Sequence, residues 1–368
     1  MSRATMGQGA VEAVASPAIP SANGYQVVFK QAETLLDAQS IPRQPALGLI
    51  HTFSAEGLEG PFKKPRRFSA INGDGFPFQW SVSLGRQTAS LRFLTDCGVP
   101  GSRISERIKH TRARLGDVAV QLGLTDSLPH LDSALAQLLP EASALDASLM
   151  GLCLAVELDS SGGVGIKVYV NSEVGDVGER YDRFERCLDF LGRPGAVKRL
   201  RTLQMTFGGS IAPAFSALDL VPKGIGRIKL YFRPTDGNAR FAALAAQAVG
   251  CDQAESQLLP LHRAFCNGEG YPAQAVDFSV EFPPEGLATG FKLDLNTGLL
   301  FGSDAEVDER VLNLLNELSF DSQPYALVRE IVAGSCSNEH VRSILFVGLA
   351  VRGLERKVNV YFHPFPAH

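Results

Sequence analysis

Two hydrophobic patterns alternate along the chain. Short segments in which apolar and polar residues alternate come in pairs, and longer segments between the pairs have apolar residues every three or four positions. The first pattern predicts β-strands and the second predicts amphipathic helices. Paired strands are expected at 76–84 with 88–95, 149–158 with 164–171, 213–221 with 226–233, 274–282 with 289–296, and 343–352 with 356–363. Helices are expected near 25–40, 102–121, 127–140, 177–191, 236–248, 254–266, 305–317 and 322–333.

The strand pairs form an internal repeat. The second strands read SLRFL, GIKVYV, RIKLYF, GFKLDL and KVNVYF, and their central positions are 92, 167, 229, 292 and 359. Five tandem ββα(α) units with no obvious edge strand predict one closed antiparallel β-barrel of ten strands ringed by helices, which is an α+β fold. We therefore expect residues 25–368 to form a single barrel domain. Residues 1–24 are small, polar and Pro-containing, and we expect them to be a disordered segment without a cleavable leader.

The two faces of each second strand differ in chemistry. In RIKLYF, Leu230 and its alternate neighbours are apolar, whereas Arg227, Lys229 and Tyr231 share the opposite face. The apolar face must pack on the helices, so the basic face is expected to point into the barrel, with the acids mostly on helices and loops. The alternative is an open sheet with its polar face in solvent, but such a face usually mixes acids and bases. The expected lumen residues are Arg92, Lys167, Arg227, Lys229, Lys292, Arg352 and Lys357, with Tyr169, Tyr231 and Tyr361.

A lumen lined by cations predicts an anionic ligand, best interpreted as a phosphate-type polyanion. Lysine and arginine side chains that converge from several strands bind such anions by charge-assisted hydrogen bonds. Tyrosine rings at the same level add hydroxyl groups, and their electron-rich faces can shield a carbocation.

Composition narrows the class of protein. The 35 Lys and Arg against 39 Asp and Glu give a formal net charge of −4, which excludes a globally basic nucleic-acid or membrane binder. The six cysteines form no CxxC pair, and the histidines and acids show no metal-ligand spacing. No uninterrupted apolar run approaches the roughly 18 residues of a membrane span. We expect a cytoplasmic protein with no metal, no nucleic-acid partner and no membrane partner.

The segments IKVYVN at 166–171 and RIKLYFRP at 227–234, with the last-strand tyrosine, make the repeats similar to a known family. From about residue 45 to 363 the chain resembles bacterial aromatic prenyltransferases of the dimethylallyltryptophan synthase type, which have the ten-stranded ABBA barrel. The resemblance implies transfer of a prenyl group from an allylic diphosphate to an aromatic acceptor, with no metal or other cofactor. It assigns the seven lumen cations to the diphosphate and the three tyrosines to shielding of the allylic cation.

The chain departs from the resembled pattern at three acceptor-side positions. Indole-prenylating members carry Glu in a P-x-E-x-S pattern, where this chain has Gln79, and a Lys near the position of Cys153. Asp294 replaces a usual Tyr. A neutral amide can hydrogen-bond but is a poor base. We expect Gln79, Trp80, Cys153 and Asp294 to contact the acceptor.

The proton acceptor is left open by these departures. Gln79 and Glu157 are the catalytic candidates, and face counting also places Asp277 and Glu281 in the lumen. Each acid could instead be a counter-ion to the cations, and released diphosphate could take the proton. Two other hypotheses remain: a non-catalytic barrel that binds a phosphorylated or prenyl-diphosphate ligand, and an unusual acceptor such as a phenol, a non-indole side chain or a residue within a peptide.

Overall fold

A computed structural model describes residues 24–58, 69, 71–72, 75–99, 101–146, 150–235, 239–266, 270–284, 290–333 and 342–367. The ten predicted strands are present and form one closed barrel in which all neighbours are antiparallel. The strands are β1 (Phe78–Leu84), β2 (Ala89–Thr95), β3 (Leu152–Leu158), β4 (Val164–Asn171), β5 (Ile211–Val221), β6 (Gly224–Pro234), β7 (Val276–Phe282), β8 (Gly290–Asn296), β9 (Arg342–Arg352) and β10 (Glu355–Ala367). The predicted α+β barrel is confirmed. The segment expected to be disordered lies, up to residue 23, outside the described residues.

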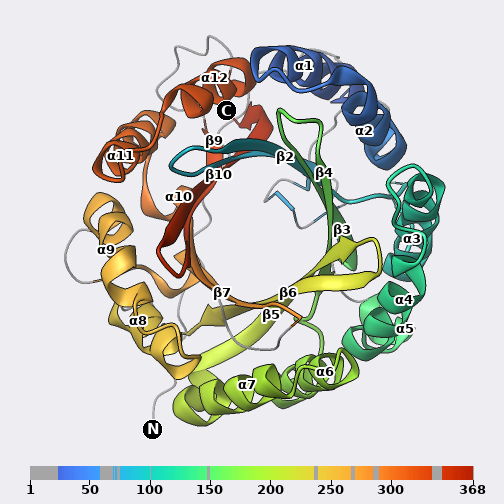
Figure 1. The fold of residues 1–368 in the computed structure, drawn as a ribbon, viewed down its shortest axis with the longest axis vertical. Helices are drawn as coiled ribbons and strands as arrows, with labels where there is room; N and C mark the ends of the chain where they lie inside the picture. Colours follow the sequence, from blue (N-terminus) through green and yellow to red (C-terminus); the bar gives the residue numbers. More distant parts are fainter. Residues whose placement is uncertain are drawn as a thin grey trace, which may run out of the picture.

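Helices surround the barrel as a ring, which is clear when the molecule is viewed down the barrel (Figure 1). They are α1 (Gly24–Ala38), α2 (Arg43–Leu58), α3 (Ile104–Ala119), α4 (Ser127–Leu138), α5 (Ala142–Leu145), α6 (Val177–Phe190), α7 (Pro194–Phe207), α8 (Ala239–Ala248), α9 (Ala254–Phe265), α10 (Thr297–Leu300), α11 (Asp304–Glu317) and α12 (Gln323–Ala333). Four of them, α2, α5, α7 and α10, lie outside the helices expected from the sequence. In α7 the spacing of Ala196, Leu200 and Leu203, which are buried, was a usable helical signal.

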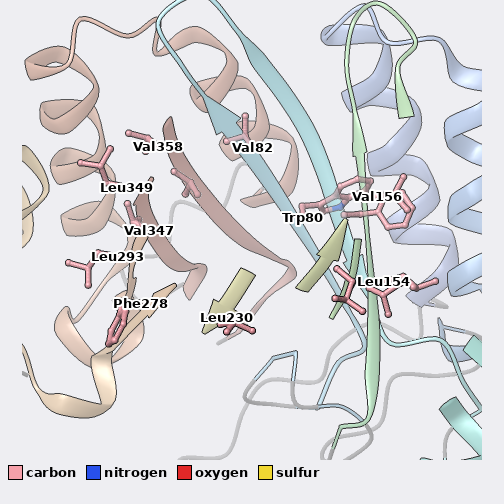
Figure 2. Packing of buried hydrophobic residues seen from close by; sticks show 14 of the residues in the cluster. Trp80, Val82, Leu154, Val156, Leu230, Phe278, Leu293, Val347, Leu349 and Val358 are labelled. Carbon is pink, nitrogen blue, oxygen red and sulfur yellow. The ribbon is translucent and has the colours of Figure 1, made fainter. Parts of the chain in front are cut away.

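The outward face of every strand packs on the helix ring. Leu230, Phe278, Leu293 and Val358 are among the fully buried members of this layer, and Figure 2 shows several of them pointing away from the barrel interior. Phe232, Phe278 and neighbouring rings stack at centroid distances near 5.2 Å. Burial of this apolar layer between strand and helix is the main stabilising contribution expected for the fold.

Trp80 belongs to this outer layer and does not face the lumen. Its side chain is fully buried, and its indole contacts the rings of Phe78 and Phe93. The indole Nε1 donates a hydrogen bond to Gln31 Oε1 on α1 at 3.0 Å. The expectation that Trp80 contacts the acceptor is therefore corrected, because strand alternation turns position 80 away from Gln79 and toward the helices.

The barrel interior has two zones. The end where the strand hairpins turn is lined by charged side chains, and Glu157, Lys167 and Lys229 lie there. Toward the opposite end, Ile71, Met150 and Cys153 form a small buried apolar cluster. Three half-buried side chains pack against this cluster: Leu94, Tyr169 and Phe215. The tyrosine level separates the two zones, because Tyr169 contacts both the charged pocket and the apolar cluster.

Candidate active site

One pocket collects the predicted lumen residues. It is lined by all seven candidate cations and all three candidate tyrosines, which come from β2, β4, β6, β8, β9 and β10. The alternation of side chains along each strand is the reason, since the basic and tyrosine positions fall on one face and closure turns that face inward. The same pocket contains residues that sequence reasoning did not assign to the site, namely Ser83, Ala350, Val351, Glu355 and Asn359.

Carboxylates lie between the cations, which corrects the expectation that acids sit mostly on helices and loops. Glu157 on β3 accepts hydrogen bonds from Arg92 Nη2 at 3.3 Å and from Lys167 Nζ at 3.2 Å. Asp219 on β5 lies 3.7 Å from Lys167 Nζ and 2.6 Å from Arg227 Nη2. A bulge in the pairing of β5 with β6 between Leu218 and Leu220 obscured this acid in the strand pattern.

Glu281 on β7 is the most heavily paired acid of the pocket. Its carboxylate contacts Arg227 Nη1 at 3.1 Å and Arg352 Nε at 3.2 Å, and it forms a short ion pair with Lys229 Nζ. The side chain is 5% exposed. Three cations therefore share one buried carboxylate, and each would otherwise be available to a phosphate-type ligand.

The pKa values of the pocket follow from burial and from these pairs. Arg92 and Lys167 hold the pKa of the Glu157 carboxyl well below its usual range, against the opposing effect of burial. Burial lowers the pKa of Lys229 to about 8; Glu281 opposes this shift, and the neighbouring cations add to it. Glu157 is thus ionised and a weak base, while Lys229 loses its charge at mildly alkaline pH.

Tyrosines form the floor of the charged zone. The Tyr169 and Tyr231 hydroxyls lie 3.5 Å apart, and their ring centroids are 5.9 Å apart. Lys292 Nζ donates to the Tyr361 hydroxyl at 2.6 Å and pairs with Asp294 at 2.5 Å. Burial opposes the charge on Lys292, but Asp294 and Tyr361 outweigh it and raise its pKa. Lys292 is therefore a permanently charged group directly beside a tyrosine ring.

Two of the acceptor-side candidates, Gln79 and Cys153, lie beyond this floor. Gln79 and Cys153 are on inward-facing positions and are 3% and 1% exposed, and neither lines the charged pocket. Gln79 is paired in register with Leu94, which packs against the apolar cluster, and the buried Nε2 of Gln79 has no hydrogen-bond partner among the described residues. Burial raises the pKa of the Cys153 thiol, so this cysteine is a neutral, apolar wall residue.

Asp277 is the remaining acid that face counting placed in the lumen. Its carboxylate accepts from Arg233 Nε at 2.9 Å, and Arg233 also pairs with Glu173 at 2.6 Å. Burial raises the pKa of Asp277, and Arg233 acts in the opposite direction. Asp277 does not line the charged pocket, and its register partner across the sheet is Asp294.

No cluster of three or more His, Cys, Asp or Glu side chains with metal-binding geometry occurs among the described residues. Within the same residues, none of the helices combines the length and the apolar character needed to span a membrane. The five described cysteines, at positions 97, 153, 187, 251 and 266, are free thiols, and Cys336 lies outside the described residues.

Comparison with known proteins finds similarity in structure and not in sequence. A scan against protein-family models and a search of curated proteins both return no match. The crystal structure of 6-dimethylallyltryptophan synthase from Micromonospora olivasterospora, in complex with DMASPP and Trp, is similar with a TM-score of 0.80 and 20% identity. The similarity covers 93% of this chain and 98% of that one.

Two further solved structures are similar to this chain over nearly its whole length. The 5-dimethylallyltryptophan synthase from Streptomyces coelicolor gives a TM-score of 0.79 at 18% identity, over 94% of this chain and 98% of that chain. Prenyltransferase PriB, in a ternary complex with L-tryptophan and dimethylallyl thiolodiphosphate, gives 0.77 at 19% identity, over 93% and 96%. The chain therefore has the ten-stranded barrel fold of the aromatic prenyltransferases of the dimethylallyltryptophan synthase type.

Proposed function

We propose that this protein transfers a prenyl group from an allylic diphosphate to an aromatic or other electron-rich acceptor. The observation that carries the proposal is the convergence of seven cations and three tyrosines on one pocket inside the barrel. The fold adds support, because similar structures were solved with DMASPP and Trp, and with L-tryptophan and a thiolodiphosphate. Lysines and arginines supply the positive charge that the diphosphate needs, so the proposed reaction does not require a metal ion.

The proposed chemistry divides between the two zones of the barrel. The allylic C–O bond breaks, and the diphosphate leaves with the electron pair among Arg92, Lys229 and the other pocket cations, which stabilise the developing charge. The faces of Tyr169 and Tyr231 shield the allylic cation and exclude water from it. The acceptor attacks with its own π electrons, forms the new bond and then loses a proton.

The pocket electrostatics favour the released diphosphate as the proton acceptor. Glu157 and Glu281 both have lowered pKa values, since neighbouring cations outweigh the effect of burial, and each is held in ion pairs. Gln79 is no base, and its unpartnered amide is suited to donating a hydrogen bond to an oxygen of the acceptor. We therefore propose acceptor positioning for Gln79 and counter-ion roles for Glu157 and Glu281.

Product analysis tests the proposal directly. The purified protein would be incubated with dimethylallyl or geranyl diphosphate and a panel of indoles, phenols and tyrosine- or tryptophan-containing peptides, in buffer with EDTA. Mass spectrometry should detect an acceptor that has gained one prenyl unit, together with an equal amount of released diphosphate. Diphosphate analogues that bind while no acceptor yields a product would contradict prenyl transfer.

A second candidate function is a non-catalytic barrel that binds a phosphorylated ligand. The observation in its favour is that the acceptor zone lacks a base, since neutral Gln79 and Cys153 occupy the positions where the resembled enzymes carry Glu and Lys. This alternative predicts tight binding of a phosphorylated ligand with no turnover, so the same incubation distinguishes the two functions.

A further inference from the structure

Among the described residues, six of the seven cations that line the charged pocket form ion pairs with carboxylates of the barrel wall. Arg92, Glu157, Lys167, Asp219, Arg227 and Glu281 form a continuous alternating series of ion pairs, which we call the ion-pair belt. The belt runs along the wall from β2 to β7, and Glu281 extends it to Lys229 and Arg352. A diphosphate that enters this pocket meets cations whose N–H groups already donate to carboxylates.

Glu281 is the carboxylate of the belt that shares the most cations with an incoming diphosphate. It contacts three cations from two strands, β6 and β9, and it is 4% exposed as a residue. Its carboxylate also lines the same pocket as those cations, so a phosphate oxygen that reaches them comes within a few ångströms of its negative charge. Two anions at that separation repel strongly in a low-dielectric pocket.

The neighbouring strand is shaped to admit this carboxylate. Gly290 on β8 lies directly between Glu281 and Arg352 in the register of the sheet. A Cβ atom at position 290 would meet the Glu281 carboxyl carbon at 3.1 Å and its Cγ at 3.2 Å. The missing side chain leaves the space through which Arg352 reaches Glu281 across the intervening strand, so the contact is built into the barrel wall.

We propose that Glu281 is an internal anion that competes with the diphosphate for Arg227, Lys229 and Arg352. This inference rests on the proposed function and adds a role for one residue of that site. Diphosphate, with about three negative charges, can displace the carboxylate from its partners, whereas a monophosphate offers too few oxygens and too little charge to do so. Glu281 thereby sets the selectivity for diphosphate over monophosphate, and its return to the cations promotes product release.

The test is a comparison of wild-type protein with Glu281→Gln, which keeps the shape and removes the charge. Titration calorimetry with inorganic pyrophosphate should show a dissociation constant lower by about tenfold or more in the variant. The affinity for inorganic phosphate should increase more than the affinity for pyrophosphate. The ratio of the phosphate dissociation constant to the pyrophosphate dissociation constant should therefore decrease. In turnover assays the variant should show a lower KM for the donor, stronger inhibition by pyrophosphate and a lower kcat.

Two further variants control the comparison. Glu185→Gln removes the same charge from α6 on the outside of the ring, where Glu185 pairs with the exposed Arg201, and should leave pyrophosphate affinity unchanged. Glu157→Gln applies the same change to the other end of the belt, where Glu157 pairs with Arg92 and Lys167, and should also tighten binding. Glu157→Gln carries the test if Glu281→Gln does not fold, since the Glu157 side chain is 30% exposed against 5% for Glu281 and pairs with two cations where Glu281 pairs with three.

Weaker or unchanged pyrophosphate binding in Glu281→Gln and Glu157→Gln would overturn the inference, because it would mean that the acids organise the cations for the ligand. An equal gain in pyrophosphate affinity in Glu185→Gln would also overturn the inference, since the change in net charge alone would then explain the tighter binding. The two proposals fail separately. Prenylated product without tighter binding in the variants refutes only the competition, and tighter binding without any product refutes only prenyl transfer.

Discussion

The two faces of the same ten strands are buried in different ways, the outward face by apolar packing and the inward face by ion pairing. On the outward face, Leu230, Phe278 and Val358 are completely buried against the helix ring, and the contacts are apolar. On the inward face, Lys229 and Glu281 are also nearly buried, but each depends on a partner of opposite charge. Residues 229 and 230 are adjacent in the chain and experience these two environments only because strand side chains alternate.

The difference separates stability from chemistry. The outward layer can lose one large side chain only at the cost of a cavity. The inward layer holds buried charges, which contribute little net stability even when they are well paired, because desolvation offsets their attraction. We therefore expect the two layers to respond differently to mutation, and four substitutions or conditions can break or sharpen that contrast.

The largest expected effect is in the outward layer. Phe278→Ala removes a ring that stacks on Phe232 and Phe291 at centroid distances of 5.2 and 5.3 Å. The free energy of unfolding should fall by about 3–5 kcal/mol, as measured by denaturant titration. A loss below about 1 kcal/mol would mean that the layer repacks freely and that the contrast between the faces is weaker than the burial indicates.

The second largest effect is expected on the inward face, at Lys229, which directly precedes Leu230 in the chain. Lys229→Ala removes one of three cations around Glu281, whose charge stays compensated by Arg227 and Arg352. The rate of prenyl transfer should fall by about 10²-fold, because Lys229 stabilises the charge that develops on the leaving diphosphate, while the unfolding midpoint changes far less than in Phe278→Ala. Retention of full activity would place the diphosphate elsewhere.

A pH profile sharpens the assignment of Lys229 without removing it. The ammonium form binds anions, and its pKa is lowered by burial to about 8, with Glu281 opposing. Thus kcat/KM for the donor should be constant below that pH and fall about tenfold per unit above it. Lys229→Arg keeps its charge at all accessible pH values, so its descending limb should move upward. An identical limb in both proteins would assign it to another group.

The smallest effect compares two buried glutamines. Within the part of the chain that the structure describes, Gln79 Nε2 has no hydrogen-bond partner, whereas Gln31 Nε2 donates to the Pro364 carbonyl at 2.8 Å and Gln31 Oε1 accepts from Trp80. Gln79→Met should be neutral or stabilising by up to about 1 kcal/mol while raising the KM of the acceptor, and Gln31→Met should destabilise by about 1–3 kcal/mol. Destabilisation by Gln79→Met with an unchanged acceptor KM would count against acceptor positioning.

The strand order and the inward basic face could be predicted from the sequence because both depend on local alternation. Lys167, Lys229 and Lys292 stand at matching places in three repeats, and one rule assigned them all to the lumen. The same rule applied to position 80 would have removed Trp80 from the acceptor site. Here the error came from taking neighbours in a motif to be neighbours in space.

The ion pairs could not be predicted in this way. Asp219 meets Arg227 across a bulged hairpin, and Glu281 meets Arg352 from a strand two places away in the barrel. Such contacts depend on the register of the closed sheet and on a glycine in the strand between, which a single strand pattern does not encode. The predicted charge segregation failed for this reason, although each acid was visible in the sequence.

The pairing of β1 with β10 makes the barrel a ring with one seam. Among the described strand pairs, this is the one that joins strands from opposite ends of the chain, and Gln31 bridges it by contacting Trp80 on β1 and Pro364 on β10. Lys357 and Tyr361 arrive only with that last strand. During synthesis the pocket therefore cannot exist until β10 has left the ribosome, so a chain interrupted before β10 holds four hairpins, two open sheet edges and an incomplete site.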